Sequence, residues 1–281
     1  MKIVLGENAY GKNAVNLTKI IRHADHHELK QVSVNISLQG NFERAHKTGD
    51  NTKVLPTDTM KNTVYVLAKE NYTSSIEDFG IFLARHFKEN NPQVSQVEIE
   101  ITEHLWSSII ADGIAHKYSY ISNGNEKHTA NILLSSNEPL VTSGIKDLLI
   151  LKTTDSAFKD YIKDEYTTLK ETDDRILSTQ CQVNWTYYSL HLDFVALYKR
   201  IRESILMTFA NHKSLSVQHT LYAMGEKVLQ GNDSVKNISF IMPNKHHLLF
   251  NLEQFGIENN NEIFIATDEP YGYITGTVTR E

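Results

Sequence analysis

The same order of predicted elements occurs twice along the chain, and this repeat is the strongest constraint on its fold. In each half, two segments with strand periodicity come first, two with helical periodicity follow, and two sets of strand segments close the half. Helices with one apolar stripe and strands with one apolar face bury both by packing together. The sequence therefore predicts an α+β fold of two antiparallel-sheet halves, residues 1–138 and 139–281, each with paired helices on one face.

In the first half, apolar residues alternate with polar ones over 32–38, and 13–22 is the expected partner strand. One helix is expected to begin near Thr57, and a second at Ser75, which forms a capping-box pattern with Asp78. Strand alternation returns at 97–101. Within the strand segment 115–134, Asn123 and Gly124 predict a hairpin turn, because this dipeptide suits the tight turns that join antiparallel strands.

In the second half, strands are predicted at 145–152 and 183–187. Asp193 and Ser216 are candidate N-caps for two helices with apolar stripes. The last part of the chain predicts four short strands, at 238–242, 248–252, 263–266 and 273–278.

Composition excludes several classes of partner and site. The formal net charge of −6 and the lack of a basic run disfavour nucleic acid, and no stretch approaches the roughly 20 apolar residues that cross a bilayer. A single cysteine, Cys181, excludes an intrachain disulfide and a zinc site built mainly from thiolates. The N-terminus has no signal-peptide pattern and the C-terminus no Ser-Lys-Leu, so we expect a cytoplasmic protein without membrane or nucleic-acid partners.

Four separated motifs carry a resemblance to a known family. They are Tyr10-Gly11-Lys12, Thr57-Asp58, the segment 158–175, and Val217-Gln218 together with residues 243–246. Over residues 10–278 the chain resembles the urate oxidases, or uricases, and without a peroxisomal tail it is similar to bacterial members. The resemblance implies a tandem T-fold whose sheets join edge to edge between subunits into a barrel. It also implies a homotetramer, with each site shared between two subunits.

The activity implied by the resemblance is the cofactor-free oxidation of urate by molecular oxygen and water, in purine catabolism, to 5-hydroxyisourate and hydrogen peroxide. Urate is a flat anion with donors and acceptors around its rim, so its site needs a cationic fork, an amide and a stacking surface. Arg175, Gln218 and Phe158 have these chemistries. The resemblance adds Thr57, Asp58 and Val217 as purine contacts, Leu169 and Ile274 as apolar walls, and Asn244 with Thr57 as the oxygen- and water-binding residues.

Catalysis requires a base, because urate loses a further proton before it passes an electron to oxygen. The resemblance implies a relay in which Lys12 acts on Thr57 while His246 takes or returns the proton. Lysine becomes a useful base only where burial or a neighbouring cation lowers its pKa, and threonine is too weak an acid to act alone. The pairing of the two residues is therefore chemically sensible, and it needs neither metal nor flavin.

Each candidate also has an ordinary structural explanation. Arg175 could be a solvated charge, Lys12 could lie in a surface turn, Thr57 could cap a helix, and His246 is one of 13 histidines. Two other functions stay open: another T-fold enzyme acting on a purine or pterin through bound zinc, or a non-catalytic purine-binding scaffold.

A cluster of histidines at 23–27 has no role in this scheme. His23, His26 and His27 lie close to Asp25, which suggests a metal site. Adjacent residues of a strand point to opposite faces, so His26 and His27 could share an ion only in a loop. We therefore expect no metal there.

Overall fold

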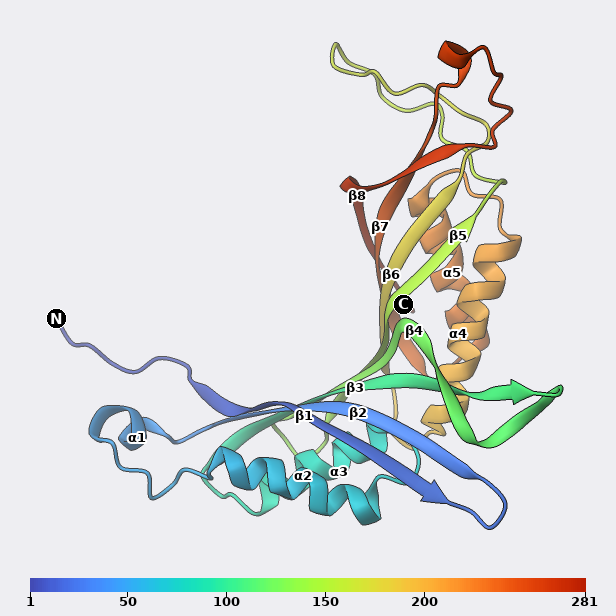
Figure 1. Ribbon diagram of the computed structural model, residues 1–281. Helices are drawn as coiled ribbons and strands as arrows, with labels where there is room; N and C mark the ends of the chain where they lie inside the picture. Colours follow the sequence, from blue (N-terminus) through green and yellow to red (C-terminus); the bar gives the residue numbers. More distant parts are fainter. The chain divides into compact units, whose positions relative to one another are not determined.

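The computed structural model describes all 281 residues and forms two compact units. The first unit comprises Met1–Gly144 with Ser189–Val195, and the second comprises Ile145–Tyr188 with Ala196–Glu281. The two-strand, two-helix, two-strand order predicted for each half is present twice (Figure 1). The prediction of an α+β fold with antiparallel sheets is therefore confirmed.

The first unit contains four strands that neighbour one another in chain order, all antiparallel. They are β1 (Ala9–Arg22), β2 (His27–Gly40), β3 (Val94–Ala111) and β4 (Ile114–Leu134). Two helices, α2 (Thr57–Asn71) and α3 (Ile76–Glu89), lie against one face of this sheet (Figure 1). A short helix, α1 (Glu43–Thr48), precedes them.

The alternation in the sequence explains the first unit's core. Val32, Val34, Ile36 and Leu38 are all buried on the helix-covered face of β2. Helix α3 begins as predicted, because the Ser75 hydroxyl oxygen accepts a hydrogen bond from the Asp78 backbone N–H at 3.0 Å. The buried helix stripes meet the sheet through Met60, Val64, Ala68, Phe79, Leu83 and Phe87.

The second unit repeats this design with β6 (Leu177–Tyr187), β7 (Val235–Leu249) and β8 (Phe264–Thr279), again in chain order and antiparallel. Strand β5 (Leu140–Lys152) contains the boundary between the units. The helices are α4 (Phe194–Asn211) and α5 (Val217–Gly231), and a single 3-10 turn, η1 (Glu253–Phe255), lies between β7 and β8. None of the chain's helices combines the length and apolar character needed to cross a membrane.

Two glycines allow α5 to pack closely on β8 and show the direction in which it crosses the strand. A Cβ added to Gly225 of α5 would lie 2.5 Å from Val278, and a Cβ added to Gly276 of β8 would lie 3.0 Å from Leu221. The helix therefore packs closely on the strand, and its lower-numbered residues lie over lower-numbered residues of β8. The start of α5 is thus directed toward Ile274.

The predicted hairpin at Asn123-Gly124 is wrong. The turn between β3 and β4 is Asp112-Gly113, where Ala111 pairs with Ile114 and the two central φ angles are 53° and 79°. Gly124, with φ 80°, instead lies in β4 between the pairs His104–Lys127 and Trp106–Ser122, where the register shifts. Both dipeptides suit positive φ, and a bulge uses that conformation as readily as a turn.

The four short strands predicted near the C-terminus are two long ones. Predicted strands 238–242 and 248–252 correspond to β7, although its pairing ends at Leu249, and 263–266 and 273–278 both belong to β8. The apparent break reflects a register shift, because Asn244 pairs with Gly272 whereas His246 pairs with Thr267. Four residues of β8, 268–271, lie opposite the single residue Lys245 of β7, so the alternation is interrupted while the ladder continues.

Candidate active site

Arg175 is a half-buried cation in the second unit, just before β6. Its Nε is buried and has no hydrogen-bond partner. The guanidinium carbon lies 5.0 Å from the centroid of the Phe158 ring, and burial lowers the pKa of this arginine. A guanidinium stays charged in proteins, so Arg175 offers N–H donors to a ligand.

Phe158 is fixed by backbone hydrogen bonds on both sides. Its N–H donates to the Thr172 carbonyl at 2.8 Å, and the neighbouring Ala157 N–H donates to the Ser214 carbonyl at 2.8 Å. The first bond joins Phe158 to the segment that leads to Arg175, and the second joins it to the segment that leads to α5. Tyr161 stacks on Phe158 with centroids 4.9 Å apart, a neighbour that the sequence analysis did not single out.

The beginning of α5 supplies the next group. Ser216 caps the helix by accepting a hydrogen bond from the His219 N–H at 3.1 Å, as predicted. Val217 is buried and Gln218 is exposed at the first two helical positions. The backbone N–H groups there have no partner within the helix and carry the positive end of its dipole. They suit a carbonyl oxygen or an anion.

Strands β7 and β8 bring Asn244 and Ile274 together. A Cβ added to Gly272 would lie 3.6 Å from the Asn244 Cβ and 3.5 Å from the Ile274 Cδ1. Ile274 pairs with the fully buried Met242, which by strand alternation shares its face with Asn244 and His246. Since the start of α5 is directed toward Ile274, these groups occupy the same end of the second unit as Gln218.

Leu169 is joined to this group only through its backbone. It lies in the loop between Phe158 and Arg175, and its side chain is exposed. Only its backbone carbonyl is engaged, by the Tyr161 hydroxyl at 2.6 Å. Its predicted place in an apolar wall stays a prediction.

Two of the three relay candidates, Lys12 and Thr57, lie in the first unit, whereas His246 lies in the second. Lys12 is on β1 opposite Ile36, and Thr57 and Asp58 are the first residues of α2. The hydrogen-bonded Lys61 ammonium, which lies 2.5 Å from the Asp58 carboxylate, is the main cause that lowers the pKa of Asp58, and Lys12 adds a smaller effect. Lys12 is therefore close enough to the start of α2 for its charge to be felt there.

Tyr10 ties these two elements together, and the sequence analysis assigned it no role. Its hydroxyl oxygen accepts a hydrogen bond from the Leu55 N–H at 2.9 Å, two residues before Thr57. Its ring meets Phe42 edge to face at 4.8 Å, and burial raises its pKa. The available signal was position, since Tyr10 and Lys12 lie two residues apart on β1 and so share a face.

The predicted site residues thus form two groups, one in each unit. Lys12, Thr57 and Asp58 belong to the first unit, while Phe158, Leu169, Arg175, Val217, Gln218, Asn244, His246 and Ile274 belong to the second.

Comparison with known proteins agrees with the motifs. The family model described as Uricase matches residues 8–133 and 141–275. This chain belongs to the uricase family. The match spans both units, including both groups of candidate site residues.

Individual uricases are similar over nearly their full lengths. The chain is 40% identical to the uricase of Arthrobacter globiformis over 280 residues, which cover 100% of this chain and 91% of that protein. It is 36% identical to the uricase of Dictyostelium discoideum, with 98% and 96% covered. The crystal structure of the Arthrobacter enzyme superposes with a TM-score of 0.95 at 40% identity, covering 100% of this chain and 96% of that one.

Proposed function

We propose that this chain oxidises urate with molecular oxygen and water, giving 5-hydroxyisourate and hydrogen peroxide, as an enzyme of purine degradation. Its membership of the uricase family supports this activity and disfavours both a zinc-dependent pterin enzyme and a purine-binding scaffold. The observation that carries the proposal is Arg175, a half-buried cation with an unpartnered Nε beside Phe158.

In the proposed site, Arg175 donates to a carbonyl oxygen and an adjacent ring nitrogen of urate. Gln218 contacts the opposite edge, and Phe158 contacts the ring face. The backbone N–H groups at the start of α5 fit a rim oxygen, because they have no partner within the helix. Thr57 and Asp58 complete the purine contacts, and Leu169 and Ile274 form apolar walls.

Lys12, Thr57 and His246 carry the proton transfers. Lys12 acts as base through the Thr57 hydroxyl, so that urate reaches its more electron-rich dianionic form. Two electrons then pass to oxygen, which leaves with two protons as hydrogen peroxide. Asn244, with Thr57, holds oxygen and later the water that adds to the oxidised ring. No cofactor takes part in this scheme.

The two groups of residues would meet between subunits. In a two-fold pair, each chain gives its first unit to one site and its second unit to the other. A homotetramer of such pairs would also cover the edge strands, whose unpaired backbone groups otherwise favour association.

Mixed oligomers test this arrangement. Thr57→Ala and Arg175→Ala subunits are each expected to be nearly inactive alone. After joint refolding from an equal mixture, about one site in four receives an intact first unit and an intact second unit, because the two choices are independent. Oxygen consumption with urate should recover to about a quarter of the wild-type rate. No recovery in demonstrably mixed oligomers would place the whole site within one chain.

Lys12→Met separates proton transfer from binding. We expect it to lower kcat by roughly 10²- to 10⁴-fold, the usual range for a lost general base, while a non-oxidisable urate analogue still binds. Equal loss of analogue affinity in Lys12→Met and Arg175→Ala would contradict the assigned roles.

Activity should also survive treatment with a chelator followed by dialysis. Recovery of activity only with an added metal or flavin would refute the cofactor-free scheme.

A further inference from the structure

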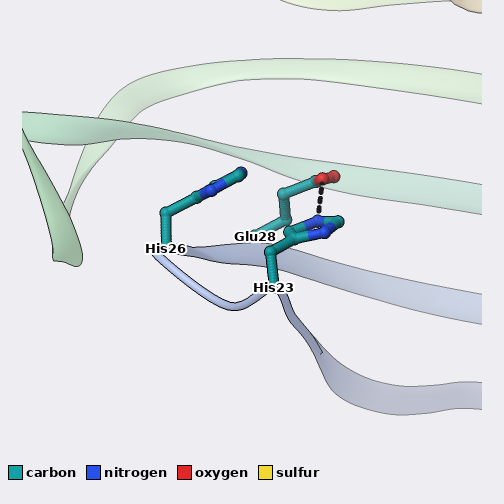
Figure 2. Close-up of side chains that lie close together, drawn as sticks. All are labelled: His23, His26 and Glu28. Carbon is teal, nitrogen blue, oxygen red and sulfur yellow. Dashed lines mark hydrogen bonds and ion pairs between the residues drawn. The ribbon is translucent and has the colours of Figure 1, made fainter.

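The turn between β1 and β2 gathers three potential metal ligands. His23, His26 and Glu28 each offer one donor atom, and these atoms lie within 4.8 Å of one another (Figure 2). The two imidazole rings stack with centroids 4.5 Å apart and an interplanar angle of 18°. Nε2 of His23 lies 2.5 Å from a carboxylate oxygen of Glu28. Two imidazoles and a carboxylate form a common ligand set for zinc.

A fourth residue orients one of these ligands. Nδ1 of His26 lies 2.8 Å from a carboxylate oxygen of Asp25, which leaves Nε2 as the free ring nitrogen. Metal-binding histidines commonly donate their second ring N–H to a carboxylate in this way, which fixes the tautomer and the ring orientation.

The backbone holds the ligands in place across a tight turn. The His23 N–H donates to the His26 carbonyl at 2.9 Å, directly beyond the last β1–β2 pair, Arg22–His27. His27 is directed elsewhere, because its ring packs against Tyr118 at 4.7 Å and its Nε2 lies 3.4 Å from Arg22. The turn therefore has the loop geometry that a metal site would need. It brings His26 close to His23, whereas His27 points elsewhere.

We propose that His23, His26 and Glu28 bind one divalent transition-metal ion of the zinc class, with water in the remaining position. Tetrahedral zinc with bonds of about 2.0–2.1 Å places its ligand atoms about 3.3 Å apart. The donor atoms lie within 4.8 Å of one another, so no pair needs to close by more than about 1.5 Å, while the His23–Glu28 pair, at 2.5 Å, needs to open by about 0.8 Å. Rotation of exposed side chains can supply that movement, since His23, His26 and Glu28 have 39%, 48% and 47% of their side-chain surface exposed.

The site is separate from the proposed chemistry. His23 follows the end of β1, eleven residues beyond Lys12, which corresponds to about 35 Å of extended strand. The ion joins the end of β1, the outermost strand of the sheet order, to the start of β2. Its role is to fasten this hairpin. None of these observations depends on the function proposed above.

Zinc titration of the full-length protein tests the proposal. Protein treated with a chelator and dialysed is titrated with ZnCl2 at pH 7.5 by isothermal calorimetry, with one ion expected per chain. His26→Ala and Glu28→Gln should each weaken binding at least tenfold, and Asp25→Asn by about 10- to 100-fold. His27→Ala is the matched control and should keep wild-type affinity. Zinc should raise the thermal midpoint of the wild type and the control, and urate oxidation should be equal in all variants without zinc.

Two results would overturn the proposal. One is the absence of stoichiometric binding up to millimolar zinc. The other is an unchanged isotherm in a His23→Ala/His26→Ala double variant, which would assign the ion to other histidines. All readouts except the activity control measure zinc binding or its effect on stability, so failure here leaves the proposed oxidation of urate untouched.

Discussion

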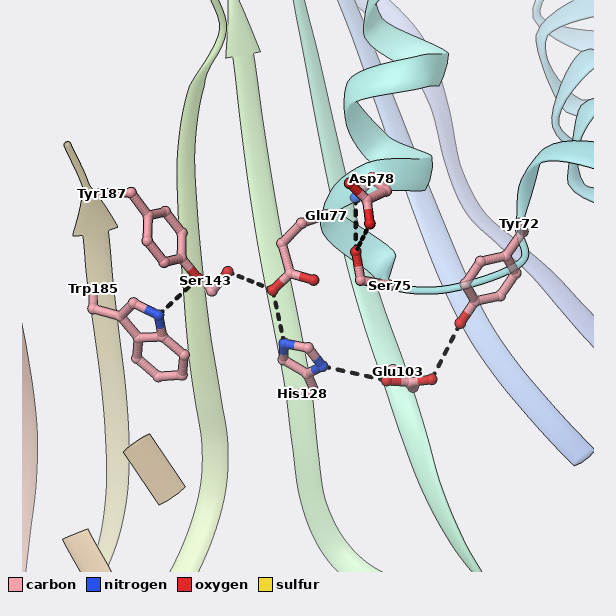
Figure 3. Close-up of polar contacts among 9 residues, drawn as sticks. All are labelled: Tyr72, Ser75, Glu77, Asp78, Glu103, His128, Ser143, Trp185 and Tyr187. Carbon is pink, nitrogen blue, oxygen red and sulfur yellow. Dashed lines mark hydrogen bonds and ion pairs between the residues drawn. The ribbon is translucent and has the colours of Figure 1, made fainter. Parts of the chain in front are cut away.

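Each unit contains a cationic side chain that is shielded from water, and the two differ in whether this side chain is paired within the protein. In the first unit His128, whose side chain is 6% exposed, has a carboxylate at each ring nitrogen: Glu77 at 3.0 Å and Glu103 at 3.3 Å (Figure 3). In the second unit the Nε of Arg175 is buried without any hydrogen-bond partner. Leaving a buried polar group unpaired costs free energy. The paired cation therefore serves the fold, whereas the unpaired one suits a ligand from outside the chain.

The His128 network joins several elements of the first unit. Glu77 is on α3, Glu103 on β3 and His128 on β4, and the Ser143 hydroxyl donates to the same Glu77 oxygen that faces His128 (Figure 3). The Tyr72 hydroxyl donates to Glu103 at 3.1 Å. Burial by itself would lower the pKa of His128, but Glu77 and Glu103 outweigh it and raise this pKa to about 9. Burial would likewise raise the pKa of Glu77, but His128 and Ser143 lower it overall.

Removing the paired cation should have the largest effect on stability. His128→Leu leaves the buried Glu77 carboxylate without its counter-ion, and such changes cost about 3–5 kcal/mol. Denaturant unfolding should show this loss, whereas His116→Leu, at an exposed histidine, should change stability by less than about 0.5 kcal/mol. Adding Glu77→Gln to His128→Leu should restore part of the loss. A loss below about 1 kcal/mol in the single variant would show that the pair does not stabilise the unit.

The same network predicts a pH dependence. The pKa of His128 is raised from 6.5 to about 9 by folding, so its contribution is complete below about pH 6.5 and disappears as the pH rises through 9. The pKa of Glu77 is lowered from 4.5, so its contribution is complete above about pH 4.5 and is lost as the pH falls through the folded value. Stability from this pair is therefore greatest between these limits.

Between pH 6.5 and 10 the free energy of unfolding should fall by up to about 3 kcal/mol, since each unit of pKa shift corresponds to about 1.4 kcal/mol. Unfolding measured at several pH values in wild type and His128→Leu checks this. The variant should lose the slope, and an equal slope in both proteins would assign it to other groups.

Removing the unpaired cation should affect binding and leave the fold intact. Arg175→Ala is expected to weaken a non-oxidisable urate analogue by roughly 10- to 150-fold, which corresponds to about 1.5–3 kcal/mol for a charge-assisted hydrogen bond. The free energy of unfolding should change by less than about 1 kcal/mol, because the substitution removes a ring contact with Phe158 but leaves no buried charge unpaired. Calorimetric binding and denaturant unfolding measure the two quantities, with the exposed Arg85→Ala as control. Destabilisation comparable to His128→Leu would remove the contrast between the two cations.

The smallest expected effect concerns Tyr10. Tyr10→Phe removes the acceptor of the Leu55 N–H and costs about 0.5–1.5 kcal/mol, the net contribution of one hydrogen bond. If Tyr10 positions the start of α2 relative to Lys12, this appears as a several-fold fall in kcat with KM and analogue affinity unchanged. Tyr65→Phe is the matched control, because the Tyr65 hydroxyl also makes a single backbone contact, to Asn16 at 3.1 Å. Equal kinetics in the two variants would leave Tyr10 with a purely structural role.

The sequence by itself determined the order of elements and the faces that pack. Alternation over β2 and the stripes of α2 and α3 are local properties, so Val34, Met60 and Phe79 could be placed in the core before any contact was known. The caps at Ser75 and Ser216 depend on residues three positions apart and were predicted for the same reason. The residues of the proposed site were found through their motifs, because residue type and spacing carried the family resemblance.

Only the tertiary structure decided which distant groups meet. Glu77, Glu103 and His128 lie 25 to 51 residues apart in pairs, and no local pattern joins them. Asp112-Gly113 and Asn123-Gly124 have similar intrinsic preferences for turn conformations. The pairing register of β3 with β4 therefore determines that the first forms the turn and the second lies at the bulge. The polar sequence around Arg175 is what one would expect around a solvated arginine. That the Arg175 side chain is half-buried, with an unpartnered Nε, follows from packing alone. Periodicity is a property of neighbouring residues, whereas burial and pairing are set by the whole fold.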